Sequence, residues 1–161
     1  MALNESQLRI TPSVLDRLVD EDPRESREAP KSRAASMSEL RRSVRRDLEW
    51  LLNTRCVIDP DEIDLEEVKK SLAMYGLPDF TGIHIKNRLE HKNLVASLEY
   101  AIRVFEPRFL DVKITVEPLN EFDRQLKFRI EARLDVDPAP EPIVFDSVLQ
   151  AGGVGFSVVE K

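Results

Sequence analysis

Cysteine, histidine and aromatic residues are scarce in this sequence, and each scarcity excludes a class of site. The one cysteine, Cys56, cannot form a disulfide within the chain, so we expect a reduced, packed side chain. The two histidines, His84 and His91, lie seven residues apart without a carboxylate-histidine motif, which argues against a metal site. Aromatic residues make up only 6% of the chain, too few for both a core and a sugar-stacking cleft. The sequence therefore predicts no cofactor and no metal.

The chain also has no excess of positive charge and no long apolar run. The chain has 24 basic against 30 acidic residues, which argues against general binding to nucleic acid phosphates. The basic run RRSVRR, Arg41 to Arg46, lacks neighbouring aromatic residues, so we interpret it as a solvated helix face open to a protein partner. No apolar stretch is long enough to cross a bilayer, and no early segment resembles a signal peptide. We expect a cytoplasmic protein with no nucleic acid partner and no direct membrane insertion.

The chain contains enough apolar residues for one well-buried domain. Its 161 residues are 42% hydrophobic and 34% charged, and they are few for two domains. We assign residues 36–161 to a single α+β domain, 21–35 to a flexible charged linker, and 1–20 to an N-terminal docking segment with a short helix. Thr11 is expected to cap that helix, with Pro12 at its first position. Because two turns are not stable alone in water, this helix must dock on the domain or on a partner.

Three helices are expected in the domain. Ser36, in a capping box with the glutamate three residues later, should begin a helix of residues 37–54. A second capping box at Asp64 should begin a helix that ends near Gly76. A long helix should cover residues 86–105. The inner faces of the first and last of these helices are apolar, and consist of Leu40, Val44, Leu48 and Leu51, and of Leu94, Leu98, Ala101, Ile102 and Phe105.

Strand patterns follow the long helix. Apolar and polar residues alternate in four segments, as in strands with one buried face, namely residues 110–117, 125–136, 143–150 and 154–159. In the first segment, Leu110 is the first residue expected to face inward. Successive strands without helices between them imply an antiparallel meander, whose last strand most simply lies at an edge. The fold class predicted is α+β, with N-terminal helices packed on one face of a small, mainly antiparallel sheet of three to four strands.

Asp47 is a charged residue on an apolar stripe. At about 100° per residue it projects between Leu40 and Leu51 on the helix of residues 37–54, so its carboxylate should need a partner when that helix packs. An arginine is the natural partner, and the candidates are Arg55 and Arg108. We assign Asp47 and Arg55 as the structural ion pair, with Arg108 as the alternative.

The triplet Glu106-Pro107-Arg108 stands at the point where helical periodicity stops and strand periodicity begins. Pro107 should end the helix. Glu106 and Arg108 together could catalyse a reaction, tie helix to strand, or dock on another protein. Glycoside hydrolysis needs a protonated carboxyl group opposite a second carboxylate, whereas an adjacent guanidinium favours the ionised form. We therefore expect no catalytic residue here, and favour docking over the tie.

Three segments carry a resemblance to a known family. SVRRDLEWLLNTR (43–55), LDRLVDEDP (15–23) and FEPRF (105–109) resemble TssE, the baseplate wedge subunit of type VI secretion systems, and the similarity covers nearly the whole chain. TssE is in turn similar to a tailed-phage wedge protein whose family label carries the word lysozyme. The resemblance implies a structural, non-enzymatic subunit, in which Glu106, Pro107 and Arg108 form the protein-binding motif that contacts the core bundle of the wedge. Phe109 stands where the family often has leucine.

The same resemblance implies the partners. They are the baseplate proteins TssF, TssG and TssK, and the sheath proteins TssB and TssC. TssE-like proteins resemble the interlocking domain of sheath subunits, so the resemblance implies that the last strand offers its edge to the first sheath ring. The alternative function is a peptidoglycan-cleaving, lysozyme-like enzyme, for which the sequence offers no catalytic motif.

Overall fold

The computed structural model describes residues 10, 12–19, 31–57, 64–80, 87–117, 125–150 and 155–160. Helices precede a sheet along the chain, as the α+β prediction requires. The elements are α1 (Val14–Leu18), α2 (Arg33–Asn53), α3 (Glu66–Lys69), the 3-10 helix η3 (Leu72–Met74), α4 (Arg88–Phe105), β1 (Phe109–Val116), β2 (Gln125–Leu134), β3 (Glu141–Gln150) and β4 (Phe156–Glu160).

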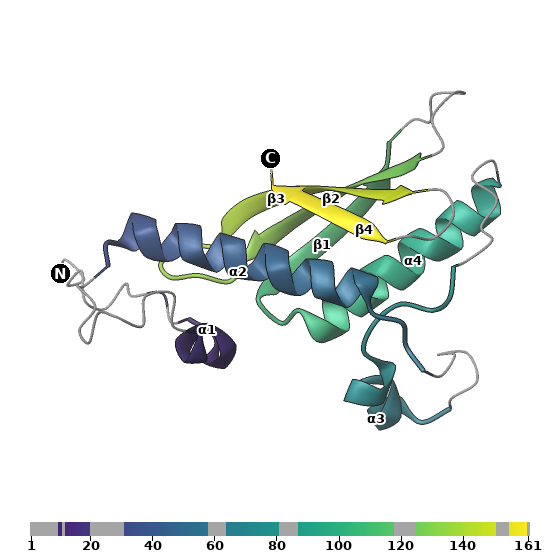
Figure 1. Ribbon diagram of the computed structural model, residues 1–161, viewed down its shortest axis with the longest axis horizontal. Coiled ribbons are helices and arrows are strands. Elements are labelled where there is room, and N and C mark those ends of the chain that lie inside the picture. Colours follow the sequence, from purple (N-terminus) through teal and green to yellow (C-terminus); the bar gives the residue numbers. More distant parts are fainter. Residues whose placement is uncertain are drawn as a thin grey trace.

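The sheet is an antiparallel meander in the order β1-β2-β3-β4, which confirms the predicted topology. Two helices cover one of its faces, α4 on the β1 side and α2 on the β4 side, and the two helices also contact each other (Figure 1). In the same view, α1 and α3 lie on the side of α2 that is away from the sheet. The fold thus has two packed layers, with α1 and α3 outside them.

Apolar residues at helical and strand spacing fill the space between the layers. Along β2, every second side chain from Leu126 to Leu134 is buried, as the alternation in the sequence predicts. The buried core consists mainly of Val44, Leu48, Leu51, Leu94, Leu98, Ile102, Leu126, Phe128, Ile130, Leu134, Ile143 and Phe145. Because α2 and α4 both bury their stripes here, their ends and the start of β1 are fixed relative to one another.

The N-terminal caps expected at Thr11 and Ser36 are wrong. Ser13 caps α1 through a capping box with Asp16, Pro12 lies outside the helix, and Thr11 lies outside the described residues. Ser32 caps α2, with its side chain accepting a hydrogen bond from the amide of Ala35. Residues 33–35 include good helix formers, so the helix extends one turn beyond the box expected at Ser36.

The second helix of the domain is shorter than expected. Asp64 does not cap α3, whose N-cap position is Leu65 and has no side-chain hydrogen bond. The Ser71 hydroxyl donates to the carbonyl of Val68 at 2.7 Å, a local bond that competes with continued helix. Gly76 has a φ of +116°, and a Cβ there would lie 2.4 Å from the carbonyl oxygen of Thr54. Glycine is required because this loop passes close to the end of α2.

Several strand boundaries also differ from the sequence expectation, since β2 ends at Leu134 rather than at residue 136 and β3 begins at Glu141 rather than at residue 143. The register of β1 shifts between Phe109 and Asp111, which turns Phe109 inward and leaves Leu110 47% exposed. The inward position expected for Leu110 is therefore wrong. In the last strand, β4 begins at Phe156, and Val154 lies outside the described residues.

Candidate functional site

Six polar residues from α1, α2 and the α4–β1 turn meet at one place, which we call the charged joint. They are Asp16, Ser43, Arg46, Asp47, Glu106 and Arg108. The turn itself is tight, because the amide of Glu106 closes α4 on Ile102 and the amide of Phe109 bonds back to Glu106. Arg108 lies directly before β1, and its backbone carbonyl accepts a hydrogen bond from the amide of Asp135, directly after β2.

Glu106 and Arg108 form the innermost pair of the charged joint. The Glu106 side chain is 5% exposed, and Arg108 Nε donates to its Oε1 at 2.6 Å while Nη2 donates to Oε2. The backbone amide of Arg108 adds a third bond to Oε1 at 3.3 Å. Such a two-pronged guanidinium–carboxylate pair is strong and has a fixed direction. Both oxygens of Glu106 are therefore occupied by the residue two positions further along the chain.

Arg108 also reaches across to α2. Its Nη2 donates to Asp47 Oδ2 at 2.7 Å, and the other oxygen of Asp47 accepts from Arg46 at 2.7 and 2.9 Å. Burial by itself lowers the pKa of Arg108, but the hydrogen bonds and charges of Glu106 and Asp47 raise the pKa above its ordinary value. Arg108 thus stays charged between two carboxylates, one from its own turn and one from a helix 61 residues earlier.

The ion pair assigned to Asp47 and Arg55 is wrong, since the alternative partner Arg108 holds Asp47. The helix α2 ends at Asn53, and Arg55 leaves it in an isolated bridge to Leu77. From there its side chain forms an ion pair with Asp79. The helical projection that placed Asp47 inward does not extend to Arg55, because the chain is no longer helical there.

The short helix α1 enters the charged joint through one side chain. Asp16 accepts from the Ser43 hydroxyl at 2.7 Å and from Arg46 Nη2 at 2.9 Å. Arg108 Nη1 in turn donates to the Ser43 oxygen at 3.2 Å. Burial by itself raises the pKa of Asp16, but the hydrogen bonds from Ser13, Ser43 and Arg46 and the charge of Arg46 lower it to about 2.

Asp16, Ser43 and Arg46 are members of the charged joint that the sequence analysis missed. For Ser43 and Arg46 the signal was available on α2, where residues 43, 46 and 47 are spaced three and four apart and so share a face. The basic run was interpreted as a solvated face, yet Arg46 turns into the joint. At the other end of the run, Arg41 pairs with Glu141 and Glu160 on the sheet.

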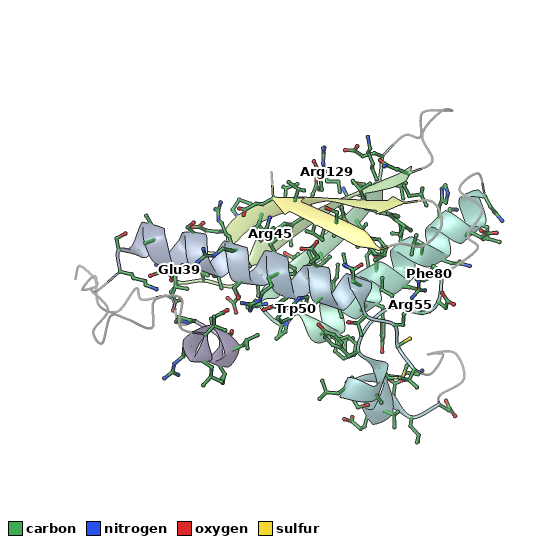
Figure 2. The ribbon with its side chains drawn as sticks, viewed as in Figure 1. Glu39, Arg45, Trp50, Arg55, Phe80 and Arg129 are labelled. Carbon is green, nitrogen blue, oxygen red and sulfur yellow. The ribbon has the colours of Figure 1, made fainter. Side chains whose placement is uncertain are left out.

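Part of the charged joint reaches the surface. Pro107 is exposed, and the side chains of Arg108 and Asp47 are 24% and 23% exposed. Trp50, one turn after Asp47 on α2, is 53% exposed, and the Arg46 guanidinium lies 5.1 Å from the centre of its ring. Figure 2 places Trp50 on the side of α2 that faces away from the sheet. Glu106 therefore holds the joint from inside, while Pro107 and Trp50 are what a partner can touch.

Other residues considered in the sequence do not extend this site. Cys56 is half-buried and not in a disulfide, and His84 lies outside the described residues. In the described part of the chain, no group of three histidine, cysteine or acidic side chains is placed to hold a metal ion. Among the same residues, no helix is both long and apolar enough to cross a membrane. Of the glycines in GGVG, only Gly155 is described, just before β4.

The edges of the sheet are a second candidate surface, and a helix side chain bonds one backbone position of each, Glu99 on β1 and Asn53 on β4. At the β1 edge, the backbone amide of Ile114 donates to Glu99 Oε1 of α4 at 3.2 Å, so a helix side chain caps this edge. The β4 edge has β3 on one side only. Val159 is 55% exposed on the outer face of β4. An edge strand offers hydrogen bonds to another chain.

Comparison with known proteins gives one match. A family model described as baseplate wedge protein gp25 matches residues 38–139, which is more than half of the chain. The matched segment contains Ser43, Arg46, Asp47, Glu106 and Arg108, but not Asp16 or the strands β3 and β4. No curated protein and no solved structure matches the chain.

Proposed function

The chain belongs to the baseplate wedge protein gp25 family, and on this premise we propose that it serves a type VI secretion system. The family assigns it a structural role in a baseplate. Within that role, the protein acts in the cytoplasm as a TssE-type subunit, links the wedge complex to the contractile sheath, and helps sheath assembly to begin.

One observation carries the proposal. The three segments that resemble TssE, residues 15–23, 43–55 and 105–109, are far apart in the chain, yet each supplies side chains to the charged joint. The first supplies Asp16, the second supplies residues of α2, and the third supplies Glu106 and Arg108. Segments that share a motif pattern and also one network of ion pairs are expected to serve one purpose.

That purpose, in the proposal, is to hold a docking surface in one shape. Glu106 is too buried to be touched by a partner, so its contribution to the Glu-Pro-Arg motif is to fix Arg108. Pro107 and Trp50 then form the exposed contacts, with Arg108 and Asp47 half-accessible between them. Aromatic and arginine side chains are the residues that most often dominate binding energy at interfaces. TssF and TssG are the partners proposed for this surface.

The second partner in the proposal is the sheath. At each edge a helix side chain bonds one backbone position, Glu99 to Ile114 on β1 and Asn53 to Phe156 on β4, and the outward-facing β4 positions beyond Phe156 have no hydrogen bond from another described segment. An edge strand can pair with an extended segment of another chain, and TssB and TssC are the chains proposed to pair with β4. The wedge contacts and the sheath contacts therefore lie on different parts of the molecule, as a linking subunit needs.

Lysozyme-like catalysis has no support in the charged joint. Both oxygens of Glu106 accept hydrogen bonds from Arg108, so this carboxyl group is not free to protonate a leaving group. Asp47, the carboxylate across the guanidinium, is occupied in the same way by Arg46 and Arg108. The family, too, is described by a structural role.

Capture of a TssF–TssG complex on immobilised protein tests the proposal. Trp50→Ala and Pro107→Ala should retain a cooperative thermal transition and lose at least about tenfold in affinity, as truncation of a central interface residue does. Val159→Ala is the matched control, because Val159 is as exposed as Trp50 but lies on β4. It should capture normally. Normal capture by both joint variants would contradict the docking surface.

A further inference from the structure

The side chain of Asn53, the last residue of α2, forms hydrogen bonds with the backbone of Phe156, the first residue of β4. Its Nδ2 donates to the carbonyl oxygen of Phe156 at 2.9 Å, and its Oδ1 accepts from the amide of Phe156 at 2.7 Å. A side-chain amide carries one donor group and one acceptor, as a peptide group does. Asn53 thus pairs with Phe156 as a residue of a neighbouring strand would. A Cβ at position 155 would lie 2.7 Å from Asn53 Oδ1, so glycine at this position leaves room for the Asn53 side chain.

The side of β4 on which Asn53 binds follows from the alternation of antiparallel pairs. Phe156 lies opposite Leu149 of β3, and residues along an antiparallel pair alternate between exchanging hydrogen bonds and not doing so. Since both polar groups of Phe156 are bonded to Asn53, they point away from β3. By the same alternation, the polar groups of Val158 and Glu160 also point to the open edge, whereas those of Ser157 and Val159 face β3.

At the outer edge of β4, the first backbone position is therefore hydrogen-bonded and the following outward-facing positions are not. Phe156 is occupied by Asn53, and among the described residues no hydrogen bond from another segment is found to the backbone of Val158 or Glu160. The Glu160 side chain pairs with Arg41 of α2 at 3.3 Å, which holds the far end of the strand without using its backbone. A strand added here meets Asn53 at one end and free backbone groups beyond it.

We propose that Asn53 is a positioning residue that sets the register of a strand added to β4, by occupying Phe156 and making pairing start at Val158. The added strand is an extended segment of a sheath subunit, and this identification rests on the proposed function. A slip by one residue would turn every side chain of the added strand to the other face, so slips occur in steps of two. Removing the Asn53 side chain frees the backbone of Phe156, two residues before Val158, to pair with the added strand.

Hydrogen exchange of backbone amides, with and without the purified TssB–TssC complex, tests this. In the free wild-type protein, the amide of Phe156 should exchange slowly and that of Val158 faster. Addition of TssB–TssC should slow Val158 by about tenfold or more and leave Phe156 unchanged. In Asn53→Ala, Phe156 should exchange fast in the free protein and become protected in the complex, because the added strand now extends to it.

Two further variants make the result decisive. Thr54→Ala removes a similar side-chain bond at the end of α2, from the Thr54 hydroxyl to the carbonyl of Trp50, without touching β4. It should behave as wild type. Asn53→Asp keeps an oxygen that can accept from Phe156, so this amide should stay protected in the free protein and gain nothing in the complex.

The inference is overturned if Asn53→Ala folds and Phe156 gains no protection with TssB–TssC. It is also overturned if neither Asn53 variant melts cooperatively, since Asn53 would then be needed for the fold rather than for register. Protection of wild-type Val158 in concentrated protein alone would identify a second copy as the occupant instead. If TssB–TssC protects neither Val158 nor Glu160 while TssF–TssG is captured normally, the sheath contact fails and the wedge contact stands.

Discussion

At the scale of single residues, Arg108 is the side chain on which the charged joint depends. It bonds to Glu106, Asp47 and Ser43, and so connects the turn after α4 to the middle of α2. In Arg108→Ala the Glu106 carboxylate, only 5% exposed, is left without its cation. Breaking a buried pair in this way costs about 3 to 5 kcal/mol in the free energy of unfolding.

Denaturant unfolding of two variants checks this prediction. Asp47→Ala should cost less, about 1 to 2 kcal/mol, because Asp47 is more exposed and its removal leaves Arg108 paired with Glu106. The double variant with Glu106→Gln and Arg108→Ala should be more stable than Arg108→Ala alone, since no buried charge is left unpaired. Equal losses for Asp47→Ala and Arg108→Ala would contradict the central position of Arg108.

Asp16 gives a prediction that depends on pH. None of the α1 residues is buried, and Val14 and Leu18 are 74% and 76% exposed, so Asp16 supplies the main contacts of this helix with α2. Its pKa of about 2 in the folded protein lies below the ordinary 3.8. The stabilisation is therefore complete above pH 3.8 and is lost as the pH falls towards 2. It amounts to about 2 kcal/mol at most.

Hydrogen exchange or limited proteolysis within residues 13–19 measures the docking of α1. Asp16→Asn should release α1 at neutral pH and remove most of the change between pH 4 and pH 2, while the core of the domain remains protected. If the release of α1 in Asp16→Asn follows the same pH profile as in wild type, another carboxylate holds the helix.

The sequence could predict Asp47, Glu106 and Arg108 as members of the charged joint, but not the pairing of Asp47. Asp47 on an apolar stripe and the triplet at residues 106–108 both stood out, because a charge on a packed face needs a partner. The choice of Arg55 failed, since it depended on where α2 ends. Asp16 was missed, because nothing local in a short, linker-flanked helix indicates which distant arginine it will meet.

At the scale of elements, α4 protects one edge of the sheet. Glu99 accepts the amide of Ile114, which would otherwise point out from β1. Glu99→Ala should lower stability by about 1 kcal/mol and expose this edge to pairing with other molecules. Light scattering on heating should therefore rise earlier for Glu99→Ala than for wild type. Glu99→Gln keeps the accepting oxygen and should resemble wild type, and equal scattering from all three proteins would contradict the cap.

Elements with strong periodicity were predictable, and their ends were not. Strand β2 follows from alternation alone, because each inward position is apolar and each outward position is polar. Leu110 broke the same pattern in β1, since a shift in register between neighbours depends on the paired strand and leaves no mark in the local sequence. The start of α2 was misplaced because two serines could cap it.

At the scale of the whole molecule, the fold separates two surfaces by a rigid core. The charged joint lies where α2 meets the turn between α4 and β1, and Trp50 lies on the side of α2 that faces away from the sheet (Figure 2). Strand β4 lies at the other edge of the sheet from β1 (Figure 1). The α+β class and the meander follow from the order of periodic segments in the sequence. How α1 meets α2 does not, because that contact is polar and joins residues 27 and 30 positions apart.

The central proposal is that this protein links a wedge complex to a contractile sheath. Fluorescently labelled sheath, followed in cells from which the gene has been deleted, tests it most directly. We predict that extended sheaths disappear, that the wild-type gene restores them, and that a folded variant lacking residues 154–161 captures TssF–TssG but does not restore them. Sheaths that extend at normal frequency in the deletion strain would contradict the claim.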